Sequence, residues 1–326
     1  MYCVFIMWRQ TIKNYFPDAV INEASLKFPI TDRGWDIEFP NTVDKPTFLV
    51  LQDMLTWDIG ARWPRELERI ATWAIAKNID QTKLFVLIWN YDLAEHWNEQ
   101  QQGMFKCIQF STFQYNLWEQ YTKSRIYIEN RFLSTGHKHN ALCLNRTDKP
   151  HRRTVVEYLR RFREVNLSDL HNGRNPYFAG QTYDEYDYNN LRNLNSLMQN
   201  YLTSRFSIIT ESQYYEPRGI ITEKTFNAII ALHPFVIIGS MGSLKEIQRL
   251  GFKTFPDYFD ESYDGYPNSM RLDRVLGLPE IHKFRPDDSV KEVCKYNRVY
   301  FFNEFGNKLC ADLHLACSRH SGNVGI

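Results

Sequence analysis

Short apolar runs recur along the chain, and they constrain its fold more than any other feature. In the first half these runs are TFLVLQ (47–52) and KLFVLIWN (83–90). Such continuous apolar runs are typical of strands that are covered on both faces of a parallel sheet. Between them, WPRELERIATWAIAKN places Leu67, Ile70 and Ala74 at helical spacing. The order predicts a strand–helix–strand unit, which FKCIQF and QYNLWEQYTK continue.

The second half repeats this alternation. NALCLN (140–145) precedes a helical pattern that starts near Pro150, and FSIIT precedes an apolar helix and the strand PFVIIG. We also interpret FKTF (252–255) as a short strand and the N-terminal MYCVFIMW as the first strand of the chain. The pattern predicts an α/β protein with two doubly wound parallel sheets.

The length of 326 residues is sufficient for two domains that each bury a core. We predict an N-terminal domain over 1–135, a second domain over 136–285, and a helical tail over 286–326 that packs back on the first domain. No apolar run is long enough to be a membrane span.

The balance of charges limits the classes of partner. The chain has 39 Lys and Arg against 38 Asp and Glu, so its net charge of +1 provides no overall attraction for nucleic acid. Six cysteines are scattered without a CxxC motif, which favours reduced thiols and a cytoplasmic location. We therefore expect any contact with a polyanion to be local.

The segment TESQYYEPRGIITEKTF (210–226) has the pattern of an anion site. Tyr214 and Tyr215 lie in a loop after a predicted strand, where open α/β sheets bind ligands. Thr222 is a candidate N-cap, which places Glu223 and Lys224 in the first turn of the following helix. A carboxylate there can accept ribose hydroxyls and a lysine can offset phosphate charge. The alternative is that Glu223 complements the helix dipole and Lys224 is solvated.

A second polar stretch, LNRTDKPHRR (144–153), leads into a helix that is rich in arginine. Arg146 and Arg152 lie in the predicted strand-to-helix loop, where a planar guanidinium can bind a diphosphate through two hydrogen bonds. A basic helix is more often a solvated face, and that alternative applies to most of the positive charges over 149–163.

Together these two stretches resemble the donor-binding segment of the α-1,3-fucosyltransferase family. The shared pattern is a strand that ends in Glu211, an aromatic loop, T-E-K, an apolar helix, Pro, a strand and Gly. Upstream, the family has a strand that ends in Asn followed seven residues later by Arg, here Asn145 and Arg152. The resemblance covers residues 140–255. This segment is also similar to exostosin-like and to phage or viral sugar transferases. Ser212 replaces the Asn that the family usually has after the strand glutamate.

The resemblance implies a GT-B glycosyltransferase, in which two Rossmann-like domains face a cleft and the second binds the nucleotide sugar. It implies that Glu223 binds the ribose and that Lys224 and Arg152 bind the diphosphate. Tyr214 or Tyr215 would then lie near the base. It also implies transfer without an essential metal or other cofactor. The donor sugar and the base are left open.

Inverting transfer needs a carboxylate that removes the proton of the acceptor hydroxyl. In a GT-B enzyme this base comes from the first domain. Asp53 follows the predicted strand FLVLQ and Asp92 follows LFVLIWN, so both are candidates. Either aspartate can equally be a helix cap or a turn residue.

Two further groups of polar residues suggest metal binding. The acidic residues Asp257, Asp260, Glu261 and Asp264 carry oxygen ligands, but a loop after a strand also needs turn residues and a helix cap, and we favour that interpretation. HKH (137–139) lacks a third ligand at a recognised spacing for zinc. We predict no metal site.

The leading hypothesis is therefore a glycosyltransferase that acts on a hydroxyl acceptor, either a glycan or a hydroxylated base in phage DNA. One alternative is a nucleic-acid-binding protein, in which the basic helix contacts phosphates and aromatic residues stack on bases. Another is a sugar-binding protein on a degenerate transferase fold. For a viral protein, the cytoplasmic location would be that of the host.

Overall fold

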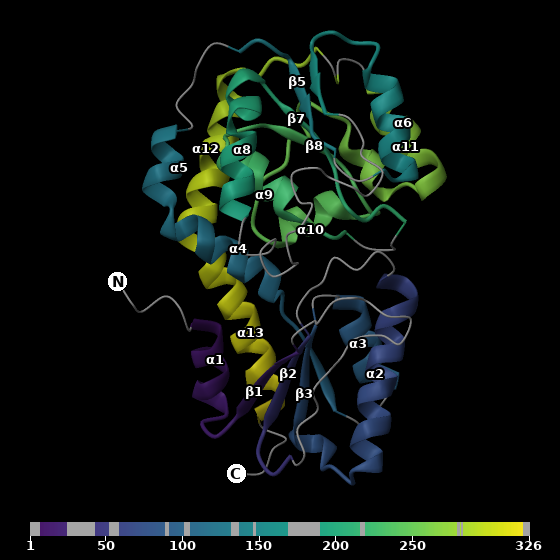
Figure 1. Cartoon of the computed structure of the whole chain (residues 1–326), viewed down its shortest axis with the longest axis vertical. Coiled ribbons are helices and arrows are strands. Elements are labelled where there is room, and N and C mark those ends of the chain that lie inside the picture. The colour runs from purple at the N-terminus through teal and green to yellow at the C-terminus, as the bar shows by residue number, and fades with distance from the viewer. Residues whose placement is uncertain are drawn as a thin grey trace. The chain divides into compact units, whose positions relative to one another are not determined.

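The structure is a computed structural model, and it describes residues 7–24, 43–51, 59–88, 91–100, 105–131, 137–145, 148–168, 190–215, 219–278, 281 and 283–321 (Figure 1). Contacts divide the chain into two compact units. Unit 1 comprises Met1–Glu119 and Gly306–Ile326, and unit 2 comprises Gln120–Phe305. The sequence-based boundaries were placed after residues 135 and 285; this division falls inside the helix Thr112–Lys123 and at the junction of the helical segments Phe301–Phe305 and Gly306–Ser321.

Unit 1 contains a parallel sheet whose strands follow the order β1-β2-β3-β4. The strands are β1 (Val20–Ala24), β2 (Thr47–Leu51), β3 (Leu84–Ile88) and β4 (Lys106–Gln109). All five residues of β3 are buried, as its continuous apolar run predicts. The described strands of this sheet are arranged in sequence order, with no reversal of direction.

Helices cover both faces of this sheet. Unit 1 contains α1 (Met7–Tyr15), α2 (Ile59–Ala76), α3 (Tyr91–Gln100), the first part of α4 (Thr112–Lys123), and α13 (Gly306–Ser321). α1 and α13 lie on one face and α2 and α3 on the other (Figure 1). The prediction of a strand over MYCVFIMW was wrong for its described residues, because Met7 begins α1, whose Trp8 and Ile12 are buried.

Unit 2 contains a second parallel sheet with the order β6-β5-β7-β8. Its strands are β5 (Ala141–Cys143), β6 (Val165–Leu167), β7 (Ser207–Thr210) and β8 (Phe235–Ile238). The chain adds β6 on one side of β5 and then returns to add β7 on the other side. The order therefore reverses between β5 and β7, as in a doubly wound sheet.

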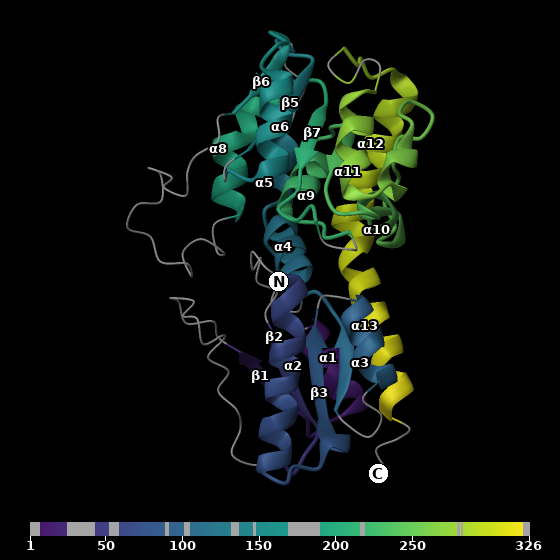
Figure 2. The same cartoon turned by 90° about the vertical axis from the view of Figure 1, so that its right-hand side faces the viewer.

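The helices of unit 2 form a layer on each face of the sheet. They are α5 (Arg125–Arg131), α6 (Pro150–Leu159), α8 (Asn190–Thr203), α9 (Glu223–Ile230), α10 (Ser243–Arg249), α11 (Asn268–Leu276) and α12 (Asp288–Tyr300). α8, α9 and α12 lie on one face in Figure 1, and α6 and α11 lie on the other, which faces the viewer in Figure 2. The predicted strand at 252–255 is absent from the sheet.

Both units are thus α/β structures with a four-stranded parallel sheet. Among the described residues, no helix has the length and apolar character needed to cross a membrane.

Candidate functional site

The carboxyl ends of β5 and β7 carry two of the predicted ligand-binding residues. Asn145 comes two residues after β5, and Glu211 comes directly after β7. Because the strand order reverses between these neighbouring strands, the helices that follow them leave toward opposite faces of the sheet. Open α/β sheets bind ligands at such a reversal. The region also contains the starts of α6 and α9, and we treat it as the candidate site.

Asn145 joins the carboxyl ends of β5 and β7 by hydrogen bonds. Its Oδ1 accepts a hydrogen bond from the Thr210 hydroxyl at 2.5 Å, and both side chains are buried. Its backbone N–H donates to the Ser168 hydroxyl at 2.6 Å, and that hydroxyl donates to the Asn145 carbonyl at 2.8 Å. The Asn145 side chain is therefore used within the sheet, and it positions the site by holding β5 and β7 together.

The first turn of α6 is bound to the end of β7. Arg152 is only 2% exposed, and its Nη2 donates to the carbonyl of Thr210 at 3.1 Å. The sequence interpretation placed Arg152 in the strand-to-helix loop; it lies instead in the first turn of α6 with its side chain buried. Arg146, the other predicted diphosphate ligand, lies outside the described residues.

His151 makes the neighbouring contact to the same strand end. Its Nε2 donates to the carbonyl of Glu211 at 3.1 Å, and its ring stacks on Tyr214 with 4.9 Å between the ring centres. Burial, together with the positive charge of Arg152, lowers the pKa of His151 to about 3. The ring is therefore neutral at physiological pH, and its Nδ1 has no hydrogen-bond partner among the described atoms.

Glu211 caps α9 from the end of β7. Its fully buried carboxylate accepts hydrogen bonds from the Thr222 N–H at 3.0 Å, the Thr225 hydroxyl at 2.7 Å and the Thr222 hydroxyl. Thr222 occupies the predicted N-cap position, but its own side chain does not cap the helix. The capping acceptor comes instead from a residue eleven positions earlier in the chain.

Glu223 and Lys224 lie in the first turn of α9, and both remain partly exposed. Their side chains are 18% and 22% exposed, and Lys224 Nζ lies 2.9 Å from Glu223 Oε1. The ammonium also donates to the hydroxyls of Ser212 at 3.0 Å and Thr222 at 3.2 Å. The ammonium is thus held directly beside the carboxyl end of β7.

The carboxylate of Glu223 is ionised, and one of its two oxygens has a hydrogen-bond partner among the described atoms. Burial is the largest single influence and acts to raise its pKa, but the charge and hydrogen bond of Lys224, together with smaller contributions from nearby hydrogen bonds, lower the pKa below its ordinary value. Its Oε2 is buried and has no hydrogen-bond partner among the described atoms. Beside this pair, Lys224, Leu144, Tyr201 and Asn227 help to line a pocket of about 50 Å³. An unpaired carboxylate oxygen at the start of α9 can accept a ligand hydroxyl.

The two predicted aromatic residues differ in exposure. Tyr214 is buried between the ring of His151 and the guanidinium of Arg271, which lies 4.6 Å from its ring centre. Tyr215 is 60% exposed and meets Tyr214 edge to face. Tyr215 is therefore the residue of the two with a ring face available for stacking.

Arg271 is a structural residue that the sequence interpretation missed. It is 1% exposed, and it donates to the carbonyls of Tyr214 at 2.8 Å, Gly239 at 3.0 Å and Tyr266 at 2.8 Å. These bonds join the loops that follow β7 and β8. Nothing in RLDR, an ordinary amphipathic pattern, distinguishes this arginine from a solvated one.

Asp260, Glu261 and Asp264 accept backbone N–H groups as turn and cap residues, but Asp264 is buried and not solvated as the sequence interpretation expected. Asp264 Oδ2 accepts the N–H groups of Leu244 and Lys245 at the start of α10, at 3.0 and 3.2 Å. Asp260 accepts the N–H of Ser262 at 3.0 Å. Glu261 accepts the N–H of Phe255 at 2.7 Å. Within the described ranges, no three His, Cys, Asp or Glu side chains are grouped so that they could hold a metal ion.

The two candidate bases belong to unit 1. Asp92 is the second residue of α3, which begins shortly after the carboxyl end of β3, but its side chain is outside the described part of the structure. Asp53 also lies outside the described residues. Their role as bases stays a prediction.

A search of protein-family models and of curated proteins finds no match to this chain.

Proposed function

We propose that this chain is a glycosyltransferase of the GT-B type, in which the reversal point of the unit 2 sheet binds a nucleotide-sugar donor. The observation that carries the proposal is the pair Glu223 and Lys224, which lies partly exposed in the first turn of α9, beside the end of β7. The resemblance of 140–255 to the α-1,3-fucosyltransferase family supports the same assignment.

The chemistry of the pair fits a nucleoside diphosphate. Lys224 supplies a positive charge for the diphosphate, and Glu223 supplies a carboxylate oxygen without a partner for a ribose hydroxyl. Tyr215 offers an exposed ring on which a base can stack. Arg152, buried against the Thr210 carbonyl, contributes by positive potential and by holding α6 in place.

In the proposed reaction, the acceptor hydroxyl attacks the anomeric carbon of the donor sugar. A carbon–oxygen bond forms, the bond to the diphosphate breaks, and a carboxylate of unit 1, Asp53 or Asp92, takes the hydroxyl proton. The acceptor is a glycan or a hydroxylated base in DNA. Lys224 stabilises the leaving diphosphate, so that no essential metal is needed.

The test is a thermal-shift panel of nucleoside diphosphates and their sugars, followed by measurement of donor hydrolysis. A ligand that binds only the folded chain stabilises it by about 2.7 kcal/mol at a concentration of 100 times Kd. We expect one nucleoside diphosphate to raise the unfolding temperature, and the corresponding sugar nucleotide to be hydrolysed slowly. Both results should persist in excess chelator.

Other outcomes would contradict the proposal. Absence of a shift with every nucleotide removes the donor site. A shift without hydrolysis or transfer, under conditions that saturate the donor, indicates a sugar-binding protein on a transferase fold. Loss of turnover in chelator with recovery on adding magnesium or manganese contradicts the metal-independent mechanism.

A further inference from the structure

The edge of the unit 2 sheet opposite the candidate site is basic. Lys138 comes three residues before β5, Arg163 two residues before β6, and Arg205 two residues before β7. Because these strands are parallel and adjacent, the residues that precede them lie at the same edge. The backbone confirms this: the N–H of Lys138 donates to the carbonyl of Thr203 at 2.8 Å, and that of Asn140 to the carbonyl of Glu164 at 2.8 Å.

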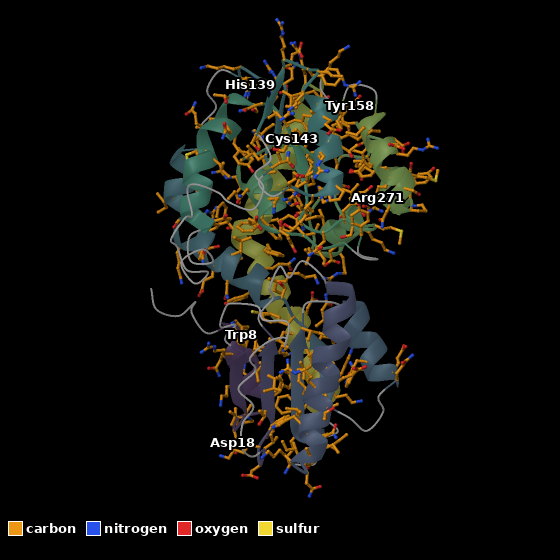
Figure 3. All side chains as sticks on the ribbon, turned by 45° about the vertical axis from the view of Figure 1, so that its right-hand side comes forward. Trp8, Asp18, His139, Cys143, Tyr158 and Arg271 are labelled. Carbon is orange, nitrogen blue, oxygen red and sulfur yellow. The ribbon has the colours of Figure 1, made fainter. Side chains whose placement is uncertain are left out.

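Helix α6 adds two arginines to this edge. α6 starts at the carboxyl end of β5 and returns the chain to the start of β6, so Arg160 and Arg161 at its end must lie near Arg163. Figure 3 shows His139 and Tyr158 at the same end of unit 2. We call Lys138, Arg160, Arg161, Arg163 and Arg205 the basic edge; of these, Arg205 is half-buried and the others are exposed.

The segments that carry the basic edge, 137–140, 157–164 and 204–206, have more basic than acidic residues. These segments contain two acidic residues, Glu157 and Glu164, beside five basic ones, although the whole chain has 39 basic and 38 acidic residues. Toward β8, Phe259 stacks on Phe206 and brings Asp257 and Asp260 to that side. The positive surface is therefore local and confined to the β6, β5 and β7 side of the edge.

The helix dipole explains only part of this arrangement. Arg160 and Arg161 follow the last turn of α6, where a positive charge is stabilising. Lys138 precedes β5 by three residues and does not follow a helix end, so the helix dipole does not explain its position. Arg205 lies close enough to His137 that, after burial, its charge contributes to lowering the pKa of that histidine. Like charges that lie close together repel one another, and a surface that nevertheless groups them is typical of a binding surface for a polyanion.

Aromatic side chains are interleaved with these arginines. Tyr158 and Phe162 are half-buried and lie 5.5 Å apart between ring centres. The guanidinium of Arg161 lies 4.6 Å from the Tyr158 ring centre. Proteins that bind single-stranded nucleic acid combine basic side chains along the phosphate backbone with aromatic rings on which the bases stack. A membrane surface would need more apolar side chains that project outward than these two half-buried rings.

We propose that the basic edge binds the phosphate backbone of a single-stranded nucleic acid, independently of the donor site at the other edge of the sheet. Arg160, Arg161 and Arg163 contact successive phosphates, and Tyr158 and Phe162 stack with bases. Lys138 and Arg205 extend the same track across the starts of β5 and β7.

The test is fluorescence anisotropy of a labelled oligothymidylate of about 20 nucleotides, a length that covers one binding site of this kind. Five phosphate contacts predict that the logarithm of the affinity falls with that of the salt concentration with a slope of about −3.5. The variant Arg161→Glu/Arg163→Glu should bind at least about tenfold more weakly, and the slope should fall in magnitude to about 2.

The matched control is Lys45→Glu/Lys77→Glu, which makes the same change in net charge at two exposed lysines of unit 1. It should retain the affinity within about twofold, because these lysines are not part of the basic edge and exposed charges are screened by salt. Equal weakening by both variants would overturn the proposal in favour of a net-charge effect. Absence of binding at about 50 mM salt overturns it outright. Retention on phosphatidylserine vesicles without oligonucleotide binding would make the edge a membrane surface.

The thermal shift by nucleoside diphosphates should be the same in Arg161→Glu/Arg163→Glu as in the unchanged chain. This result verifies the fold of the variant and separates the test of the basic edge from the test of the donor site.

Discussion

The two sheets have the same number of strands and the same parallel pairing, but they differ in strand order. In unit 1 the described strands follow the sequence order, so α2 and α3 lie on one face. In unit 2 the order reverses between β5 and β7, and α6 and α9 leave toward opposite faces. The reversal brings two helix starts to neighbouring strand ends, which is the arrangement that α/β proteins use to bind ligands.

The polar side chains follow this difference. In unit 2, Asn145, Arg152 and Glu211 are buried at the strand ends and hydrogen bond across β5, β7, α6 and α9. In unit 1, β3 is apolar throughout, and the residues that directly follow β1, β2 and β3 lie outside the described part of the chain. Buried polar groups are costly unless they are fully paired, so their concentration at one edge indicates a site that is built to hold a fixed shape. We expect binding to depend on unit 2 and proton removal on unit 1.

The largest expected effect would separate binding from chemistry. If Asp53 is the base, Asp53→Asn lowers transfer by about 10²- to 10⁴-fold while donor binding is unchanged, because an amide cannot accept the proton. The measurement is the transfer rate at saturating donor, compared with the donor Kd of the same variant.

Asp92→Asn is the matched variant, since it makes the same change after the next strand of the sheet. Only one of the two aspartates should produce the large loss of transfer. Near-normal transfer by both variants would remove the assignment of the base to these positions. A fall in the unfolding temperature together with transfer would instead indicate a cap.

The next effect concerns the buried cap of α9. Glu211→Ala removes the acceptor of the Thr222 N–H and of two threonine hydroxyls in a fully buried position. We expect it to lower the free energy of unfolding of unit 2 by about 3 kcal/mol, because buried donors are left without partners. Hydrogen exchange of the α9 amides and urea unfolding would measure this loss.

Glu292→Ala is the control, since its carboxylate is 70% exposed and pairs only with Lys295 among the interactions described. Its effect should stay within about 0.5 kcal/mol. If Glu211→Ala costs no more than this control, the cap does not stabilise α9.

Acid should weaken unit 2 through its buried histidines. Burial lowers the pKa of His151 to about 3 and that of His233 to about 4. In the unfolded chain these histidines bind protons below about pH 6.5, whereas in the folded chain they bind them only near pH 3 to 4. The free energy of unfolding therefore falls as the pH is lowered from about 6.5 toward 4. Between pH 7.5 and 5 we expect a loss of about 2 kcal/mol for each histidine.

Unit 1 offers the comparison. Its His314 is exposed and bonds to the Tyr15 hydroxyl, so no such buried neutral ring is described there. Unfolding followed by hydrogen exchange at pH 7.5 and 5 should show the larger loss in unit 2. His151→Gln should reduce the pH dependence of unit 2, and an unchanged dependence would contradict the burial of a neutral His151.

Local signals in the sequence identified the elements and the start of α9. Thr222 lies at the N-cap position and Glu223 and Lys224 lie in the first turn, as their order along the chain predicts. The apolar run MYCVFIMW was ambiguous because short apolar runs suit a strand or a helix, and Met7 proves to begin a helix.

The contacts that organise the site lie beyond local pattern. The burial of Arg152 depends on a carbonyl of Thr210, 58 residues away, and the cap of α9 comes from Glu211 rather than from Thr222. Arg271 joins loops that are distant in sequence, and its flanking residues have the pattern of a solvated helix. Such roles are set by tertiary packing, which no spacing rule encodes.

The smallest expected effect tests the pair at the start of α9. Lys224→Ala removes one charge-assisted contact to a diphosphate, which is worth about 1.5 kcal/mol, or roughly a tenfold increase in Kd for the nucleoside diphosphate. Glu223→Gln retains the shape but weakens the contact to ribose, so the loss should appear for the nucleoside as well as for the diphosphate. The two variants thus distinguish the part of the ligand that each residue contacts.

The matched control is Lys291→Ala, which should bind the ligand normally. Lys291 lies in the first turn of α12 and pairs with Asp288 at 2.8 Å. Glu223→Gln should change the unfolding temperature without ligand little, whereas Lys224→Ala leaves the Glu223 carboxylate without its cation and should lower this temperature. Unchanged affinity in both variants would place the donor away from α9 and remove the functional difference between the two sheets.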